Sequence, residues 1–283
     1  MKWAKQNYFP SIISGVAKSR LAWVFVVGLF VVLTMFLCWP MVKGLILLPL
    51  DLLVSSYRPW VEPGTILLKN PYMQDSVVQM FPWKQFVFSS FRQGIVPFWN
   101  PYQHDGMPFM ASMKPMVFYP LSLLGLLGDI KGWNVLLWLQ EFLSMSFSYL
   151  LCRSLGIGRI ASVFGVISYS MSSLMIGVLE FGSEGHVLLW LPLMIVCIKK
   201  YIDTTRGVYA AGLATSVALS IFAGQLQYTA YMLAFAVAFI LYYGRLERVK
   251  PRVYLVIGLS LLAGVGMTAI QLGPAVELFR LSA

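Results

Sequence analysis

Residues 21–38 read LAWVFVVGLFVVLTMFLC, an apolar run without a charged residue. A helix needs about 20 predominantly apolar residues to cross the hydrocarbon core of a bilayer. Comparable runs follow at 133–152, 160–179, 186–199, 208–224, 226–243 and 253–270. The sequence therefore predicts an all-α fold: a polytopic transmembrane helical bundle with about seven spans, forming one domain over 1–283.

The composition agrees with a protein that is solvated mostly by lipid. Of the 283 residues, 59% are hydrophobic and 11% are charged, and the mean hydropathy is +0.76. A soluble globular domain carries about 25% charged residues. This chain lacks the polar residues to cover a globule in water, which excludes an ordinary soluble protein.

The basic residues predict the orientation of the bundle. With a cytoplasmic N-terminus, the inner segments are 1–20, 153–159, 199–207 and 244–252. They hold 13 of the 21 Lys and Arg residues and only two acids, Asp203 and Glu247. This is the positive-inside bias of membrane proteins. It accounts for the net charge of +10 without nucleic acid, so we expect no nucleic-acid partner.

The same orientation places residues 51–132, between the first two spans, outside the cytoplasm. Residues 76–93 carry aromatic and basic side chains that suit an interfacial helix. Residues 116–127 are apolar, but they are too short to cross and contain Pro120, so we expect an interfacial or re-entrant helix. The prolines of PFWNPY at 97–102 restrict the backbone, and an ordered loop of this length is typical of a functional segment.

Almost every acid, amide and histidine that is not simply a loop charge lies on the predicted outer side. They are Asp51, Asp75, Gln79, His104, Asp105, Glu180, Glu184, His186, Gln225, Gln227, Gln271 and Glu277. Two readings are open: an outer-face site, or ordinary solvation of outer turns, which suffices for Glu184 and Glu277. We favour the site because the outer turns are short and still carry acids at the membrane boundary.

The remaining patterns do not predict a metal centre. The three cysteines are dispersed, which is unlike a disulfide framework or a zinc site. Methionine recurs every three residues from Met107 to Met116, near His104. Such a set can bind Cu(I), but we interpret it as an apolar stripe against lipid.

The motifs of the outer segment resemble the YfhO-type family of bacterial membrane proteins. They are Asp-x-x-x-Gln at 75–79, PFWNPY at 97–102, Gly-x-Pro at 106–108 and FYPL at 118–121. The later outer turns agree, with GSEGH, GQLQY and QLGPAVE. The resemblance runs from about residue 50 to the end. The chain ends at LFRLSA without a closing element, which predicts an N-terminal portion of a longer protein.

The resemblance implies a fold and an activity. The family belongs to the C-type (GT-C) superfamily of glycosyltransferases, so a GT-C-like bundle in the bacterial inner membrane is expected. The expected donor is a polyprenyl-phosphate-linked sugar, and the expected acceptor is a cell-envelope glycan on the outer face. In that superfamily an acid of the first outer loop serves as base or positions the acceptor; Asp75 matches this acidic position and is the first choice as catalytic residue, and Asp51 is the second. Adjacent acids or an Asp-x-Asp pattern, frequent in that superfamily, are missing here, so no metal ligands are assigned and a divalent cation stays an open alternative.

The substrate contacts expected on this reading are Gln79, Arg92, Asn100, His104, Asp105, Glu180, His186 and Gln225. An inverting transfer needs a carboxylate to take the acceptor proton and a cation to steady the departing phosphate. Lys84, Arg92, Lys114 and Arg280 are candidates for that cation, and contact with lipid headgroups is the alternative for each.

Two other function classes compete with the transferase. One is a transporter or flippase for a lipid-linked or small polar substrate, and the other is a non-catalytic envelope assembly protein. Glu141, inside the second predicted span, bears on the first, because an ionisable residue within a membrane is costly and is a functional candidate. Its alternatives are a proton-coupled site, a substrate contact or a hydrogen bond to a neighbouring helix in the neutral form, and we favour the hydrogen bond.

Overall fold

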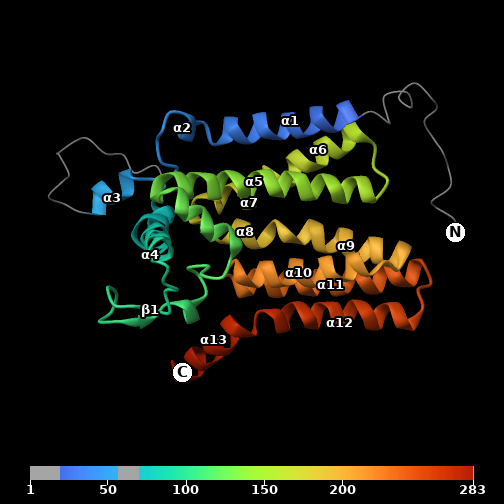
Figure 1. The fold of residues 1–283 in the computed structure, drawn as a ribbon. Coiled ribbons are helices and arrows are strands. Elements are labelled where there is room, and N and C mark those ends of the chain that lie inside the picture. The colour runs from blue at the N-terminus through green and yellow to red at the C-terminus, as the bar shows by residue number, and fades with distance from the viewer. Residues whose placement is uncertain (1–19, 57–69, 283) are drawn as a thin grey trace.

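The computed structural model describes residues 20–56 and 70–282, whose regular elements are helices apart from one short hairpin (Figure 1). Labels with η mark 3-10 turns and one π-helix. The first half contains α1 (Arg20–Leu37), α2 (Trp39–Val42), α3 (Asp51–Ser56), η2 (Pro71–Met73), η3 (Ser76–Met80), α4 (Phe81–Arg92), β1 (Trp99–Asn100), β2 (Met107–Pro108), η4 (Met110–Ser112) and η5 (Pro120–Leu127). The second half contains α5 (Asp129–Ser154), α6 (Arg159–Ser170), α7 (Ser173–Gly177), η6 (Leu179–Phe181), α8 (Glu184–Leu188), α9 (Trp190–Thr204), α10 (Gly207–Phe222), α11 (Leu226–Leu246), α12 (Pro251–Met267) and α13 (Ala269–Leu281).

Four helical stretches are long and apolar enough to cross a membrane: Asp129–Ser154, Arg159–Gly177, Glu184–Thr204 and Leu226–Leu246. The pair α12 and α13 would make a fifth span, although it bends by 70° at its junction. Two further apolar helices, Trp23–Leu37 and Gly207–Phe222, are shorter. The chain is therefore a multi-pass membrane protein. Each of the seven expected spans corresponds to a helix, but the number seven itself stays a prediction.

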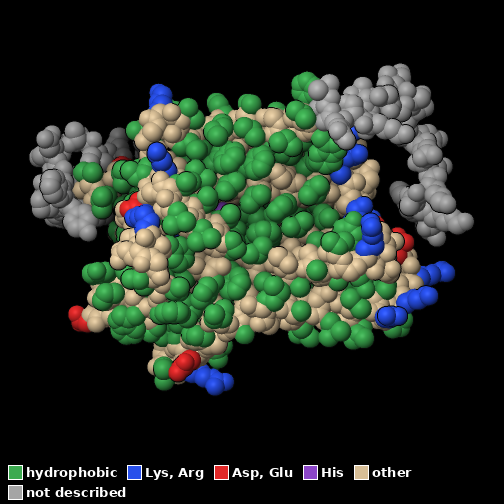
Figure 2. Space-filling view, in the orientation of Figure 1, with side chains coloured by type: hydrophobic (Ala, Val, Ile, Leu, Met, Phe, Trp, Pro, Cys, Tyr) green, Lys and Arg blue, Asp and Glu red, His purple; other side chains and the backbone are tan. Residues whose placement is uncertain are grey.

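The long helices lie side by side, and their connections divide between two ends of the bundle (Figure 1). The N-terminal end of α1 and the turns α5–α6, α9–α10 and α11–α12 meet at one end, at the right of the figure. Lys and Arg side chains gather at that end (Figure 2). The opposite end holds α3, α4, the hairpin and α13. We call these the basic end and the loop end; their assignment to the cytoplasm and the outside follows from the positive-inside rule.

Helix α4 fulfils the expectation of a helix over 76–93, and Pro82 shapes its start. Proline has no N–H for the carbonyl four residues earlier, and its ring clashes with that carbonyl. The turn before it widens: residues 76–80 form a π-helix, closed by a hydrogen bond from the Phe81 amide to the Ser76 carbonyl. Residues 120–127 form a 3-10 helix of 8 residues that does not cross the bundle.

Close contacts at glycine fasten the loop end to the bundle. Gly224, in the α10–α11 turn, has a φ of +94°, and a Cβ there would lie 2.7 Å from the carbonyl oxygen of Met113. The backbone of the outer segment therefore rests directly on this turn. Helix α13 bends away from α12 and packs on η4 from the other side.

Helices α10 and α12 form the most extensive helix pair of the bundle, and Gly264 permits their approach. A Cβ at Gly264 would lie 2.6 Å from both the Ala214 carbonyl oxygen and Val217 Cβ. Small residues allow such backbone approach in membranes, where association depends on van der Waals packing.

Gly264→Ala is expected to lower the free energy of unfolding by about 1–3 kcal/mol, because the added methyl group forces the two helices apart. Thermal unfolding in detergent measures this. Gly266→Ala is the matched control, since Gly266 faces open space on the same helix. Equal melting temperatures for the two variants would contradict the close contact.

Candidate functional site

The residues expected to form the site fall into three places at the loop end. Asp51, Asp75, Gln79 and Glu180 lie around the π-helix; Asn100, His104 and Asp105 lie in the hairpin; Glu184, His186 and Gln225 lie inside the bundle mouth. The first set brings carboxylates together, the second forms a turn, and the third forms an internal hydrogen-bond network.

The segments that hold Asp51 and Glu180 meet at the π-helix although they are far apart in the sequence. Helix α3, which Asp51 begins, and η6, which holds Glu180, both pack against the π-helix. Leu52, Val77 and Leu179 from these three elements share one apolar cluster. Burial raises the pKa of Glu180 above its ordinary value, and the negative charge of Asp51 raises it further.

Asp75 lies at the start of the same π-helix, directly before Ser76. Its side chain is exposed and makes no capping bond to the helix. Gln79, within the π-helix, is half-buried. A π-helical turn frequently marks a functional site. Asp75 is thus an exposed carboxylate directly before the π-helix on which α3 and η6 pack.

The hairpin residues have a backbone role. The Asn100 side chain accepts a hydrogen bond from the Tyr102 amide at 3.0 Å, as in an Asx turn. His104 and Asp105 are exposed and have φ values of 51° and 56°. His and Asp are enriched among residues that adopt this conformation. These residues form the turn between β1 and β2, and a Cβ at Gly106 would lie 2.6 Å from the Trp99 ring.

Two of the four candidate phosphate partners are engaged within the protein. Arg92 donates to the Gly125 carbonyl at 3.0 Å and forms an ion pair of 2.8 Å with Asp129 at the start of α5. Lys84 is only 3% exposed and donates to the Pro115 carbonyl at 2.9 Å and to Ser122 Oγ at 3.0 Å. The interpretation of Lys84 as an accessible headgroup or phosphate contact is therefore wrong.

Glu184 is not the solvated loop acid that its position suggested. It is 7% exposed, and its carboxylate accepts hydrogen bonds from Ser183 Oγ and, at 3.1 Å, from Gln225 Nε2. His186 is buried beside it, 3.3 Å from the Tyr119 hydroxyl and 3.1 Å from the Leu136 carbonyl. The glycines of GSEGH are the sequence feature that indicates this close packing, because a Cβ at Gly185 would overlap the Gln140 side chain.

Gln140 and Glu141 form a buried polar spot inside α5. Both are fully buried, and within the described residues none of their side-chain nitrogen and oxygen atoms has a hydrogen-bonding partner. The expected hydrogen bond from Glu141 to a neighbouring helix is therefore wrong. Glu141 lies near the side chains of Cys38 and Tyr169.

The fold defines the class of this chain as a helical multi-pass membrane protein, and comparisons with known proteins add no family to that class. No protein-family model matches the sequence, no curated protein matches it, and no solved structure matches it. Over residues 20–56 and 70–282, no group of three or more His, Cys, Asp or Glu side chains could hold a metal ion. The carboxylates at the loop end stay the candidate site, on the geometry described above.

Lys84 predicts a pH dependence of stability. Burial lowers the pKa of Lys84 from 10.5 to about 7. Between these values the unfolded chain binds a proton that the native chain does not, so the free energy of unfolding should rise with pH, by at most about 1.4 kcal/mol per pH unit. Unfolding titrations from pH 7 to 9 measure the slope. Lys84→Met should remove this rise, and an unchanged slope in that variant would exclude Lys84 as its source.

Glu141→Met is expected to raise the free energy of unfolding by about 1–3 kcal/mol, because it removes a buried carboxyl group without a hydrogen-bonding partner. Glu141→Gln keeps the polarity and should change stability little. Unfolding in detergent compares the two. A loss of stability in the Met variant would contradict the prediction and indicate that the carboxyl group has a partner, such as an ion or water.

Proposed function

We propose that this chain is a membrane glycosyltransferase, or the membrane portion of one. It transfers a sugar from a polyprenyl-phosphate-linked donor to a cell-envelope acceptor at the loop end, on the outer face of the membrane. The observation that carries the proposal is the pair Asp51 and Glu180, held against the π-helix that Asp75 precedes. The sequence resemblance of residues 75–121 independently selects Asp75 as the catalytic acid.

The three carboxylates, Asp75, Asp51 and Glu180, have different roles in the proposed reaction. Asp75 is exposed and is the carboxylate that can reach an acceptor hydroxyl in solvent. In the proposed step Asp75 takes the hydroxyl proton while the acceptor oxygen forms a bond to the anomeric carbon. The bond from that carbon to the phosphate oxygen breaks, and the electron pair leaves with the polyprenyl phosphate. General-base assistance of this kind contributes about 10²–10⁴-fold to a rate.

Asp51 and Glu180 serve as positioning groups in this proposal. Burial raises the pKa of Glu180, which favours its protonated form relative to an exposed acid, and Asp51 lies close enough to add to that rise. Two carboxyl groups in one region suit the adjacent hydroxyls of a sugar ring. Lys114, which is half-buried on the segment that rests on Gly224, is the proposed cation for the departing phosphate, since Lys84 and Arg92 are engaged elsewhere.

The test measures transfer of labelled sugar from polyprenyl-phosphate donors to envelope glycan in membranes that contain the full-length protein. Asp75→Asn should lower transfer by about 10²-fold or more, because amide nitrogen cannot act as the base. Asp51→Asn and Glu180→Gln should weaken donor binding and leave measurable turnover. Protein level in the membrane is the check on folding.

Glu277→Gln is the matched control, because Glu277 is an exposed acid at the loop end on α13. It should transfer sugar at the wild-type rate. Wild-type transfer by Asp75→Asn removes Asp75 from the mechanism. Wild-type transfer by all three variants of the carboxylate group overturns the proposed function.

A transporter or flippase is the second candidate, and Gln140 and Glu141 are the observation that favours it. Both lie within a spanning helix without hydrogen-bonding partners in the described part of the chain. Polar groups at this depth are typical of substrate and ion pathways. Glu141→Gln distinguishes the candidates, because it should abolish lipid-linked sugar translocation in a flippase and leave sugar transfer unchanged in the proposed enzyme.

A further inference from the structure

A pocket of about 460 Å³ lies at the basic end, distant in the fold from the carboxylate group. Its lining combines two acids, Asp203 and Glu247, with two bases, Arg248 and Lys250, over apolar side chains that include Val249 and Val253. The volume falls within the range of about 300–1,000 Å³ that is usual for small-ligand sites. The pocket presents both charge signs at one place, on a face that is otherwise basic.

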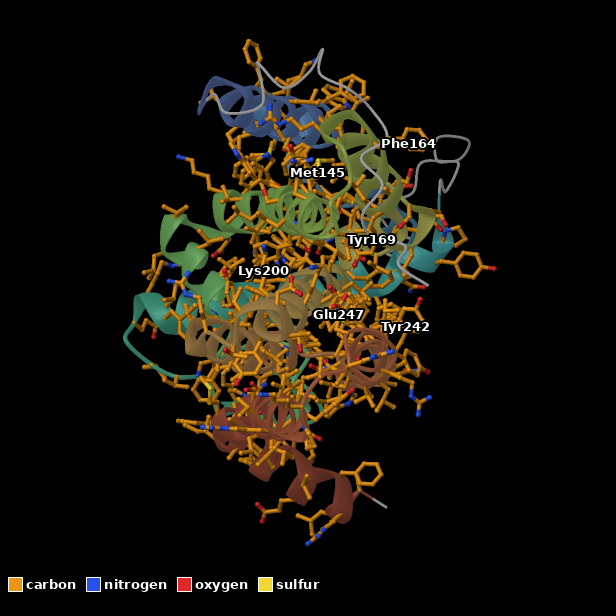
Figure 3. The ribbon with its side chains drawn as sticks, turned by 90° about the vertical axis from the view of Figure 1, so that its right-hand side faces the viewer. Met145, Phe164, Tyr169, Lys200, Tyr242 and Glu247 are labelled. Carbon is orange, nitrogen blue, oxygen red and sulfur yellow. The ribbon has the colours of Figure 1, made fainter. Side chains whose placement is uncertain are left out.

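The position of the pocket is the inner boundary of the bundle. Asp203 lies in the last turn of α9, while Glu247 and Lys250 lie between the end of α11 and the start of α12. Figure 3 views this end directly, with Lys200 and Glu247 near the middle of the face. Because α9 and α11 end there as spanning helices, the pocket opens at the level of lipid headgroups.

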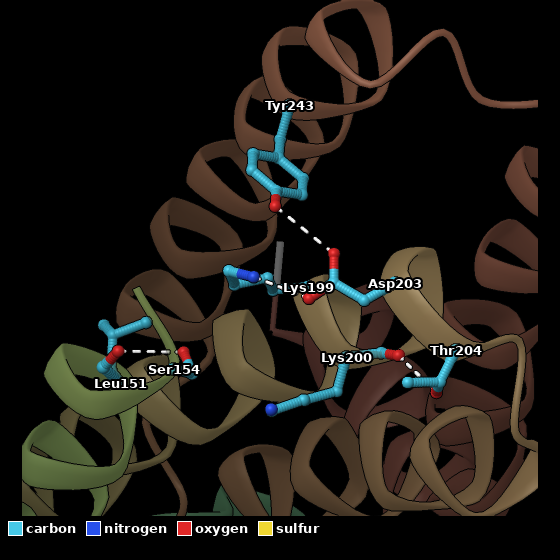
Figure 4. Close-up of polar contacts among 7 residues, drawn as sticks. All are labelled: Leu151, Ser154, Lys199, Lys200, Asp203, Thr204 and Tyr243. Carbon is cyan, nitrogen blue, oxygen red and sulfur yellow. Dashed lines mark hydrogen bonds and ion pairs between the residues drawn. The ribbon is translucent and has the colours of Figure 1, made fainter. Parts of the chain in front are cut away.

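The acidic side of the pocket is fixed by a network. Asp203 accepts a hydrogen bond of 2.6 Å from Lys199 Nζ and one of 3.3 Å from the Tyr243 hydroxyl (Figure 4). Glu247, in the turn after α11, lines the same pocket as Asp203. These are the two acids of the predicted inner segments. The pocket therefore brings both of them to one place on a basic face.

The basic side of the pocket is suited to a phosphate. Arg248 adopts a φ of 52°, in the tight turn between α11 and α12. Lys250 is the N-cap residue of α12, and Pro251 follows at the first helical position. The N-terminus of a 17-residue helix carries partial positive charge, which adds to the attraction of the two bases for an anion.

We propose that this pocket binds the headgroup of a zwitterionic phospholipid with a primary ammonium group. Its phosphate contacts Arg248, Lys250 and the N-terminus of α12, and its ammonium contacts Asp203 and Glu247. The apolar side chains of the pocket, Val249 and Val253, receive the first part of the lipid chains. An anionic lipid without an amine offers no hydrogen-bond donor to Glu247, and a quaternary amine cannot donate hydrogen bonds to either carboxylate.

The test uses the full-length protein in detergent with lipids of identical acyl chains. Native mass spectrometry and thermal shift compare phosphatidylethanolamine, phosphatidylcholine and phosphatidylglycerol. Phosphatidylethanolamine should bind about tenfold more tightly than either of the others, a difference of about 1.4 kcal/mol. Equal or tighter binding of phosphatidylglycerol overturns the proposal, as does equal binding of phosphatidylcholine.

Variants separate the two halves of the pocket. Glu247→Gln should abolish the preference for phosphatidylethanolamine over phosphatidylglycerol, and Arg248→Gln with Lys250→Gln should weaken both lipids. Glu247 is exposed, so its replacement leaves the Lys199–Asp203–Tyr243 network in place. Arg245→Gln is the control, because Arg245 is exposed at the same end and lies outside the pocket lining. A Glu247→Gln protein that keeps the preference overturns the proposal, as does loss of the preference in Arg245→Gln.

Discussion

The absence of water in the bilayer core is the constraint on which the structure depends. An unpaired backbone N–H or C=O costs several kcal/mol there, so a chain crosses the core as helices that satisfy their own hydrogen bonds. Irregular backbone is confined to places where protein or solvent surrounds it. This chain follows the rule: the π-helix, the hairpin and most 3-10 turns lie at the loop end, and the spanning helices are joined by tight turns. Chemistry that requires shaped backbone is therefore concentrated at one end.

The same constraint explains how much of the fold the sequence could predict. Apolar runs and basic loops are local properties, and each expected span has a helix at its position. The length of a span depends in addition on tertiary contacts, which can bury polar residues at its end. The run at 186–199 looked short because GSEGH interrupts it, yet Glu184 and His186 are helical and buried. Their polar atoms are paired inside the protein, which hydropathy does not register.

The sequence predicts which polar residues lie at the loop end, but it does not predict which of them contact one another. Asp51 and Glu180 are neighbours only because α3 and η6 pack on the same π-helix, a contact that no short pattern contains. Lys84 had the composition of an interfacial lysine, but α4 turns it inward to Pro115 and Ser122. Asn100 and His104 stood beside prolines and a glycine, and that context correctly indicates a turn. Which polar groups meet depends on tertiary packing, and a single sequence does not supply it.

The packing of residues 107–116 against later parts of the chain has a consequence for the order in which the protein is assembled. The segment from 107 to 116 rests on the α10–α11 turn through Gly224, and α13 covers η4 from the other side. Both partners lie about 100 or more residues later in the chain. During synthesis the segment leaves the ribosome long before these helices exist, and contacts between residues distant in sequence form late. When the ribosome has completed α5, neither Gly224 nor α13 has been made, so residues 107–116 reach their final packing only after the last helix of this chain.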